Sequence, residues 1–295
     1  MKANSSHIVY YLTRNLFLGF GFSLLFDKST KDSYIGILLG MALGLLFMYG
    51  YSYIIKLKGK KTLKEIFKNQ QTLGLITRII LLIVSVIILT YVLVIYKIFI
   101  VSFLLVSSPE LFITIPFIIL ATMAAFKGIK GITRLSSSLV VVSIVFSVLI
   151  GACLFCLVET TNLLPILTTP PMGILETTLT YAGISTFPNI LILHITDNSK
   201  GIIKTYVLAS ILLFLAAICI NGVLGEALVN IFRFPEYMVL KQIKLFNFIE
   251  KMENVLSIIW IIDLFITGSM AIYSIKEMMP QKNNKACTII SLVIL

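Results

Sequence analysis

The chain has 295 residues, of which 58% are hydrophobic and only 13% are charged, and its formal net charge is +11. Its mean hydropathy is +1.02. A soluble domain of this length has no interior large enough to bury so much apolar surface, so the composition excludes an ordinary soluble protein. Apolar runs of about 20 residues instead fit helices that cross a bilayer, where each backbone N–H and C=O must be paired within the segment.

The apolar runs follow one another along almost the whole chain, and they are rich in Leu and Ile without strict alternation, which predicts helices. We expect an all-α polytopic membrane protein with a single transmembrane, permease-like domain over residues 1–295. A ninth span opens at Ala286 and reaches only half of a crossing by Leu295, so the bundle looks truncated there. The eight full spans expected are Ile8–Phe26, Tyr34–Ile55, Ile79–Val106, Leu111–Phe126, Leu139–Val158, Ile174–Ile195, Ile203–Leu224 and Val255–Ile275.

The distribution of basic residues predicts the topology. Sixteen of the 24 Lys and Arg residues lie in the N-terminal segment and in every second loop after it, whereas only six lie in the alternate segments. Because Lys and Arg concentrate in short cytoplasmic loops, the N-terminus is expected to be cytoplasmic. The positive charge then faces anionic membrane lipid, so it requires no nucleic-acid partner.

Two connecting segments are longer than a turn. The segment KLKGKKTLKEIFKNQQTLG is basic and has Leu63, Ile66 and Phe67 at helical spacing, which predicts a short amphipathic helix on the membrane surface. The segment from Glu226 to Asn254 is too polar to span and too apolar to remain in water. We expect it to lie flat or to dip into the outer vestibule, where it would cap a central cavity.

Two spans carry residues that interrupt helices. The first contains Gly19-Phe20-Gly21 near its middle, and the sixth contains glycine, hydroxyl side chains and a proline between Tyr181 and Asn189. Such stretches unwind and expose backbone groups to a polar ligand. Interruptions in the first and sixth spans are typical of a five-plus-five inverted repeat. The alternative is that the glycines only let helices pack closely and the proline only kinks one helix.

Ionisable side chains within spans are costly in lipid and are therefore informative. Lys97 lies deep in the third span, Glu176 near one end of the sixth and Asp263 near the middle of the eighth, while Arg14 lies in the first. One interpretation is an ion or charge pathway formed by Lys97, Glu176 and Asp263. The other is a structural ion pair, either Lys97–Asp263 or Lys97–Glu176.

The sequence has no pattern that indicates an enzyme. It contains no phosphate-binding glycine loop, HExxH, GxSxG or paired CxxC motif. The HITD sequence from His194 to Asp197 ends a predicted helix without a second cluster of ligands, so we interpret it as interfacial polar residues. We therefore expect no enzymatic activity, no cofactor and no metal site.

Several stretches resemble, in order, the spore germination receptor B-subunit family (GerAB-like), a branch of the amino acid/polyamine/organocation (APC) permease superfamily. The most specific is an I-E-x-x-E/N turn that leads into a helix containing tryptophan. The matching stretches are SSHIVYYLTRNLFLGFG, KKTLKEIF, GIKGITRLSS, NLLPIL, TYAGISTFPNILIL, FPEYMVLKQI and FIEKMENVLSIIWIIDLFITGSMAIYS.

The resemblance implies a LeuT-type fold of ten helices with helices 1 and 6 broken, of which this chain would lack half of the ninth and all of the tenth. It also implies a membrane subunit of a nutrient-germinant receptor in the inner membrane of the endospore, with A and C subunits as partners and a small amino acid as ligand. The ligand-binding residues implied are Gly19, Phe20, Gly21, Thr90, Tyr91, Tyr181, Gly183, Ser185, Asp263 and Thr267.

Three functions remain open from the sequence. The first is a receptor subunit that binds a small amino acid and signals germination. The second is a proton-coupled amino-acid permease that uses Glu176 or Asp263. The third is a scaffold whose pocket is vestigial, an interpretation favoured by the short ninth span.

Overall fold

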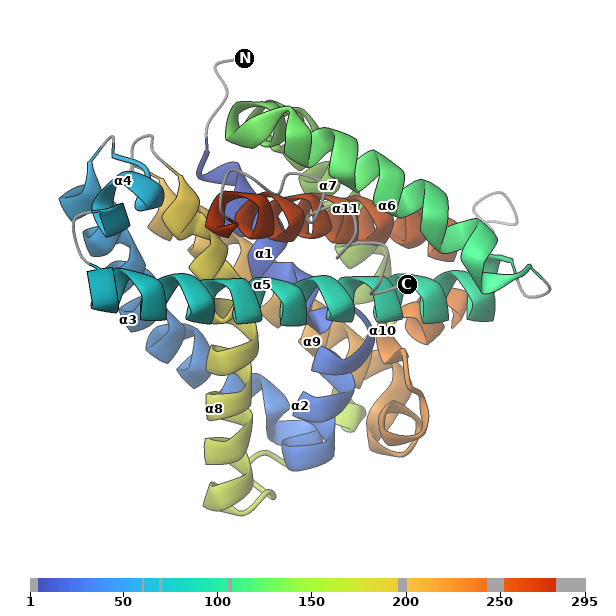
Figure 1. Cartoon of the computed structure of the whole chain (residues 1–295). Helices are drawn as coiled ribbons and strands as arrows, with labels where there is room; N and C mark the ends of the chain where they lie inside the picture. The colour runs from blue at the N-terminus through green and yellow to red at the C-terminus, as the bar shows by residue number, and fades with distance from the viewer. Residues whose placement is uncertain are drawn as a thin grey trace.

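The computed structural model describes residues 5–59, 61–68, 71–105, 108–195, 201–242 and 252–279, and within these ranges the protein is helical and contains no strand. Figure 1 shows the helices in chain order. The elements are α1 (His7–Asn15), the π-helical turn η1 (Phe17–Gly21), α2 (Phe22–Ser29), η2 (Thr30–Asp32), α3 (Ser33–Lys58), α4 (Leu63–Lys68), α5 (Gln71–Phe99), the π-helical turn η3 (Ile100–Leu104), α6 (Glu110–Phe126), α7 (Gly128–Phe155), η4 (Thr160–Leu163), α8 (Pro171–Thr186), η5 (Pro188–His194), α9 (Ile202–Ile231), α10 (Pro235–Met238), η6 (Val239–Gln242) and α11 (Met252–Met278).

All eight predicted spans appear as helices. In the described part of the chain, six helical stretches are long and apolar enough to cross a membrane: His7–Ser29, Ser33–Lys58, Gly74–Leu104, Gly128–Phe155, Ile202–Ile231 and Glu253–Met278. The predicted fourth span, α6, is apolar but has only 17 residues. The predicted sixth span is divided between α8 and η5. The ninth span predicted from Ala286 lies outside the described residues.

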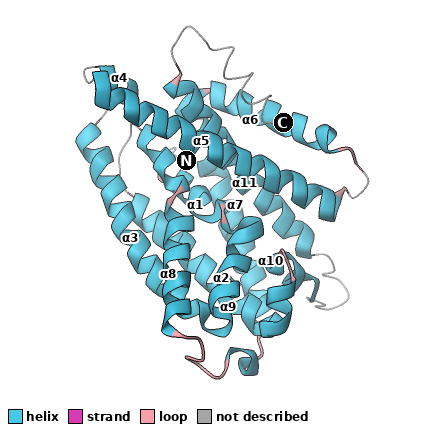
Figure 2. Ribbon diagram, turned by 60° about the horizontal axis from the view of Figure 1, so that its bottom comes forward, coloured by secondary structure: helices cyan, strands magenta, loops and turns pink. Residues whose placement is uncertain are grey.

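Helix α1 occupies the middle of the bundle in both views (Figures 1 and 2). It packs against α7, α9 and α11, and every residue from Ile8 to Asn15 is buried. A helix that is buried on all sides meets protein rather than lipid, so its polar side chains must find protein partners. By contrast, α3, α5 and α7 carry many exposed leucine, isoleucine and valine side chains. In a membrane protein these outer faces meet lipid.

The two long connecting segments are helical where they are described. Helix α4 begins with a capping box, in which Thr62 Oγ1 accepts the Glu65 N–H at 3.3 Å and Glu65 Oε2 accepts the Thr62 N–H at 3.1 Å. Leu63 then packs against Leu81 and Met278, so this predicted amphipathic helix docks on the bundle. The segment after α9 turns into the protein as α10 and η6, whose residues Pro235–Tyr237 are buried, so of the two expected arrangements it dips inward rather than lying flat.

Asp32 holds the end of the first transmembrane segment against the loop before α8. Its carboxylate accepts the backbone N–H groups of Leu167 and Thr169, each at 2.8 Å. Burial alone would raise the pKa of Asp32, but these N–H groups hold that pKa below its usual value. Asp32 therefore stays ionised and fixes the loop that leads into α8.

Candidate functional site

The first transmembrane segment is broken at the predicted glycines. Helix α1 ends at Asn15, the chain continues as the π-helical turn η1, and α2 begins at Phe22. Gly19 has φ +102°, a conformation that residues with a Cβ rarely adopt. A Cβ on Gly21 would lie 2.7 Å from the carbonyl oxygen of Leu16, so this position also requires glycine. The first helix is therefore interrupted at the predicted glycines, but by a π-helical turn with one left-handed glycine rather than by an unwound segment.

Side chains from two other parts of the chain satisfy the backbone of this break. The Gly19 N–H donates to Oε1 of Glu236 at 3.1 Å, and the Tyr91 hydroxyl donates to the Leu16 carbonyl at 3.0 Å. The guanidinium of Arg233 lies 4.7 Å from the centre of the Phe20 ring. A backbone group that leaves the helix ladder must find such a partner when it is buried. Predicted residues Gly19, Phe20 and Tyr91 thus meet at the break.

Glu236 is a candidate site residue that the sequence analysis did not identify. It lies on α10, only 6% exposed, and its second oxygen, Oε2, has no hydrogen-bond partner in the described structure. Burial raises the pKa of Glu236 to about 8, although its own N–H and that of Gly19 offset part of the rise. The available signal was a single acidic residue within the apolar stretch FPEYMVL.

Aromatic packing fixes the position of α10. Phe234 and Tyr237, on either side of Glu236, pack with Phe99 and Trp260 in one cluster. The ring centres of Phe99 and Trp260 are 4.6 Å apart, and those of Phe99 and Tyr237 are 5.6 Å apart. This packing holds the Glu236 carboxylate at the break of the first helix.

A second buried charge, Arg14, lies one turn and a half before Gly19 along the first helix. Its Nε is 3.4 Å from Oδ2 of Asp263, and both side chains are buried. Its Nη1 also donates to the Tyr10 hydroxyl and, at 3.1 Å, to Ser147 Oγ. Arg14 therefore links α1 to α7 and α11. Thr267, one turn beyond Asp263 on α11, is fully buried on the same helix.

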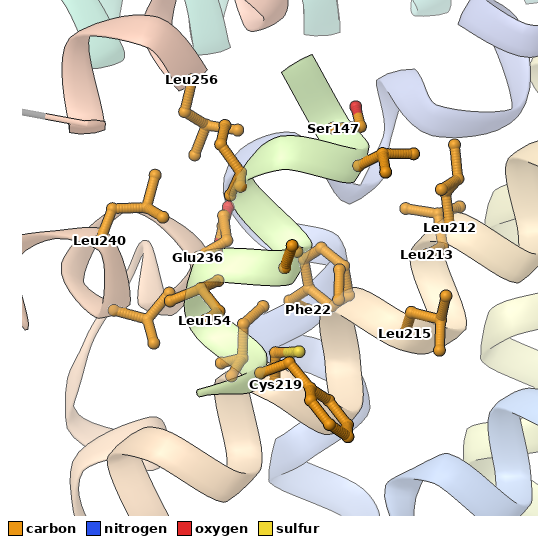
Figure 3. A pocket seen from close by; sticks show the side chains of 18 of the residues that line it. Phe22, Ser147, Leu154, Leu212, Leu213, Leu215, Cys219, Glu236, Leu240 and Leu256 are labelled. Atoms are coloured by element: carbon orange, nitrogen blue, oxygen red, sulfur yellow. The ribbon is translucent and has the colours of Figure 1, made fainter. Parts of the chain in front are cut away.

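A cavity of about 350 Å³ lies beside the break and is lined mainly by aliphatic side chains. Figure 3 shows Glu236 within it, among Leu154, Leu240 and Leu256, with Ser147 at another part of the wall. Arg14 and Glu236 are its two charged lining residues. The remaining lining residues come from α2, α7, α9, η6 and α11: Phe22, Ser147, Val148, Ile150, Gly151, Ala152, Leu154, Phe155, Leu212, Leu213, Leu215, Ala216, Cys219, Ile220, Val239, Leu240, Leu256 and Trp260.

The predicted break of the sixth span is different from the one expected. Tyr181 to Ser185, expected to be unwound, lie in regular α-helix, and α8 continues to Thr186. The change comes at Pro188, which has no N–H for the α-helical ladder, and the chain goes on as the 3₁₀-helix η5. The interruption is thus a change of helix type rather than an unwound segment.

Side chains from η5 itself and from α3 satisfy backbone carbonyls around this second interruption. Asn189 Nδ2 donates to the Ser185 carbonyl at 2.8 Å and to Thr13 Oγ1 at 3.0 Å, which links η5 to α1. At the far end of η5, the buried ammonium of Lys58 donates to the carbonyls of Leu193 and, at 2.8 Å, Ile195. A cation at a helix C-terminus stabilises the carbonyls that have no partner within the helix.

His194, at the end of η5, belongs to a chain of hydrogen bonds between helices. Its Nε2 lies 2.7 Å from Ser274 Oγ, which in turn lies 2.6 Å from Ser85 Oγ. Asp197, the other polar residue of the HITD sequence, lies outside the described residues. Across the described ranges, no group of three or more His, Cys, Asp or Glu side chains lies close enough to hold a metal ion.

Two predicted ligand-binding residues point away from the break. Thr90 on α5 and Gly183 on α8 are exposed. Each continues a row of exposed residues spaced by three or four, which marks the outer face of its helix. By contrast, Tyr181, Ser185 and Asp263 are buried, and the ring of Tyr181 lies 5.1 Å from that of Phe17 in the break. The exposed rows are Ile83, Ile87 and Val94 on α5, and Leu175 and Leu179 on α8 with Phe187 directly after it.

The predicted pathway of Lys97, Glu176 and Asp263 does not come together. Lys97 pairs with Glu110 at 2.9 Å, Glu176 pairs with Lys28 at 3.6 Å, and Asp263 pairs with Arg14. The expected pairings of Lys97 with Asp263 or Glu176 are therefore wrong. The reason is helix register: α5 begins at Gln71, several residues before the predicted span, so Lys97 lies near its end and is partly exposed.

Comparison with known protein families agrees with the resemblance noted in the sequence. The spore permease family model, described as spore germination protein, matches residues 5–295, which is nearly the whole chain. The chain belongs to the spore germination protein family. This spore germination protein is a multi-pass integral membrane protein of a transporter or receptor type, not of an enzyme family. A comparison with curated proteins finds no match.

Proposed function

We propose that this spore germination protein is the membrane subunit of a nutrient-germinant receptor, that it binds a small amino acid at the break of its first helix, and that binding signals germination. One observation carries the proposal: a buried guanidinium, that of Arg14, and a buried carboxyl group, that of Glu236, line one cavity beside the interruption of the first helix at Gly19. An amino acid is itself a small molecule with one group of each charge.

The cavity has the features of a small-molecule site. Its volume of about 350 Å³ falls in the range of ligand pockets, which combine an apolar wall with a few polar groups that fix orientation. Arg14 offers donors to a carboxylate, because its guanidinium remains charged. Asp263 already balances part of that charge, so the ligand carboxylate would join an existing pair rather than meet an isolated cation.

Signalling follows from the origin of the cavity wall. It includes residues of α7, α9, η6 and α11 as well as the ends of the broken helix. A ligand that contacts all of these helices favours the conformation in which they lie closest together, and binding therefore shifts the population toward that conformation. In a receptor, the A and C subunits would sense that shift at the inner membrane of the endospore.

The second candidate is a proton-coupled amino-acid permease. The observation that favours it is the buried Asp263, which faces Arg14 across α1 and α11 and is the kind of carboxylate that carries a coupling proton. Arg14 itself cannot release a proton in a protein. Coupling would therefore require Asp263 to take up the proton and to release Arg14.

Binding and uptake measured side by side separate the two functions. The full chain is reconstituted into proteoliposomes and given a panel of radiolabelled amino acids, with and without a pH gradient. Saturable binding without uptake supports the receptor subunit. Uptake that follows the pH gradient supports the permease. If the protein shows no binding and no uptake, both functions are contradicted.

A further inference from the structure

Glu236 is a buried carboxylate without a counter-ion among the described residues. Its Oε1 accepts the Gly19 N–H, whereas its Oε2 has no hydrogen-bond partner and the side chain lines the cavity. Burying an ionised carboxylate without a cationic partner is costly, so such a group stays neutral until a cation, here one supplied by a ligand, pairs with it. Arg14, the other charged lining residue, differs because Asp263 already balances it.

The unpaired oxygen is held in place. Phe234 and Tyr237 lock α10 into the aromatic cluster, and the Gly19 N–H fixes the other carboxylate oxygen. A rigid acceptor of this kind favours one partner, a group that carries positive charge and N–H donors. A primary ammonium group has both.

The rest of the cavity is apolar and large. Leucine, isoleucine, valine and phenylalanine side chains form most of its wall (Figure 3). Its volume of about 350 Å³ lies well above the roughly 10–15 Å³ that a single water molecule requires. A methyl side chain would leave most of that space without contacts, whereas a branched or aromatic side chain would fill it.

We propose that Glu236 binds the ammonium group of the ligand, and that the cavity selects an amino acid with a bulky apolar side chain, such as leucine, over alanine. This inference rests on the proposed function, since it names the ligand class of the same site. Glu236 then has two roles. It binds the ligand, and through its bond to the Gly19 N–H it also attaches α10 to the interrupted helix.

The test is equilibrium binding to the full chain in lipid nanodiscs, with four probes. They are L-leucine, L-alanine, 3-methylbutylamine, which has no carboxylate, and 4-methylpentanoate, which has no amine. The wild type is expected to bind leucine at least tenfold more tightly than alanine. Glu236→Gln should lower the affinity for leucine and for 3-methylbutylamine at least tenfold, because a neutral amide loses the charge-assisted hydrogen bond. Its affinity for 4-methylpentanoate should remain within twofold of that of the wild type.

The matched control for charge is Glu226→Gln. Glu226 lies on α9, half-exposed, and pairs with Lys31 at 3.6 Å outside the cavity. This variant should bind leucine within twofold of the wild type. Equal leucine affinity in Glu236→Gln and the wild type would overturn the role of Glu236 while leaving amino-acid binding intact.

A second pair of variants tests the cavity without touching a charge. Gly151 lines the cavity and Gly50 lies on α3, and a Cβ at either meets nothing within 4 Å, so both accept a larger side chain. Gly151→Leu should lower the affinity for leucine at least tenfold and the affinity for alanine less than threefold. Gly50→Leu should change neither affinity. If Gly151→Leu leaves leucine binding unchanged, or alanine binds as tightly as leucine, the proposed selectivity is wrong.

A lipid chain is the competing occupant of the cavity, because the cavity is open on its outer side. Val148, Phe155 and Leu215 line the cavity and are also exposed, so it reaches the lipid-facing surface between α7 and α9. A lipid chain as the sole occupant predicts that the wild type binds none of the four probes. That outcome contradicts the proposed function itself. Leucine binding that is unchanged in Glu236→Gln contradicts only this inference.

Discussion

The two interruptions that the sequence presents as equivalents are built in different ways. At Gly19 the helix passes through a π-helical turn in which this glycine has a positive φ, and its N–H donates to a side chain from α10 beside a cavity. At Pro188 one helix type follows another, and Asn189 and Lys58 satisfy the local carbonyls. Both interruptions find partners outside their own helix, but the first lies beside the cavity, and we place the proposed ligand site there.

Alanine at the two glycines gives the largest expected difference. Gly19→Ala places a Cβ at a positive φ and 3.0 Å from Ile95 Cδ1, so it should lower the free energy of unfolding by about 2–4 kcal/mol and weaken ligand binding. Gly183→Ala, in regular helix with open space, should be stabilising by about 0.5–1 kcal/mol. Thermal melting and leucine binding of both variants measure this contrast. Equal effects would mean that the two interruptions are alike.

Removing the cation at the second interruption should affect stability and spare the ligand site. Lys58→Met keeps the aliphatic stem but leaves the carbonyls of Leu193 and Ile195 without their donor, at a cost of about 1–3 kcal/mol. Thermal melting of the detergent-solubilised variant should therefore fall. Its leucine affinity should remain within threefold of the wild type, and a loss larger than that would place the site at η5.

The pH dependence of binding should follow Glu236. Burial raises the pKa of Glu236 to about 8, so its carboxyl is mostly protonated at pH 7 and ionises as the pH rises through that value. Since the ionised form binds an ammonium group, leucine affinity should rise roughly eightfold between pH 7 and pH 8.5. Tyr91, whose hydroxyl is bonded to the Leu16 carbonyl, interacts electrostatically with Glu236, and Arg14, which stays charged, lines the same cavity.

Glu236→Gln is the control for this profile, because it removes the titrating group. Its leucine affinity should be weak and flat over the same range. Affinity that falls with rising pH in the wild type would mean that the neutral acid, not the carboxylate, contacts the ligand.

The smallest effects are expected at the outward-facing positions. Thr90 and Gly183 lie on exposed faces, so Thr90→Val and Gly183→Leu should change leucine affinity by less than twofold. Binding measured at saturating and half-saturating leucine checks both. A tenfold loss of leucine affinity in either variant would show that this helix face belongs to the ligand site.

The sequence was sufficient for the helices and for the break at Gly19, because long apolar runs and paired glycines have direct physical meaning. It did not reveal which face of a helix turns inward. Helix α5 is apolar on all sides, so nothing in its pattern places Thr90 outward and Tyr91 toward the break. It also could not pair charges that lie far apart in the chain. Arg14 and Asp263 meet only because α1 and α11 pack together, and Glu236 reaches Gly19 only because α10 folds into the bundle.

The central claim is that the ligand binds at the break of the first helix, and photolabelling tests it most directly. A leucine analogue with a diazirine in its side chain is bound to the full chain in nanodiscs, activated by light, and located by peptide mass spectrometry with excess leucine as competitor. The account predicts competed labels on the cavity wall, on α7 between Ser147 and Phe155 and on α9 between Leu212 and Ile220. Competed labels confined to residues Tyr181–Asn189 would contradict it and would make the second interruption the binding site.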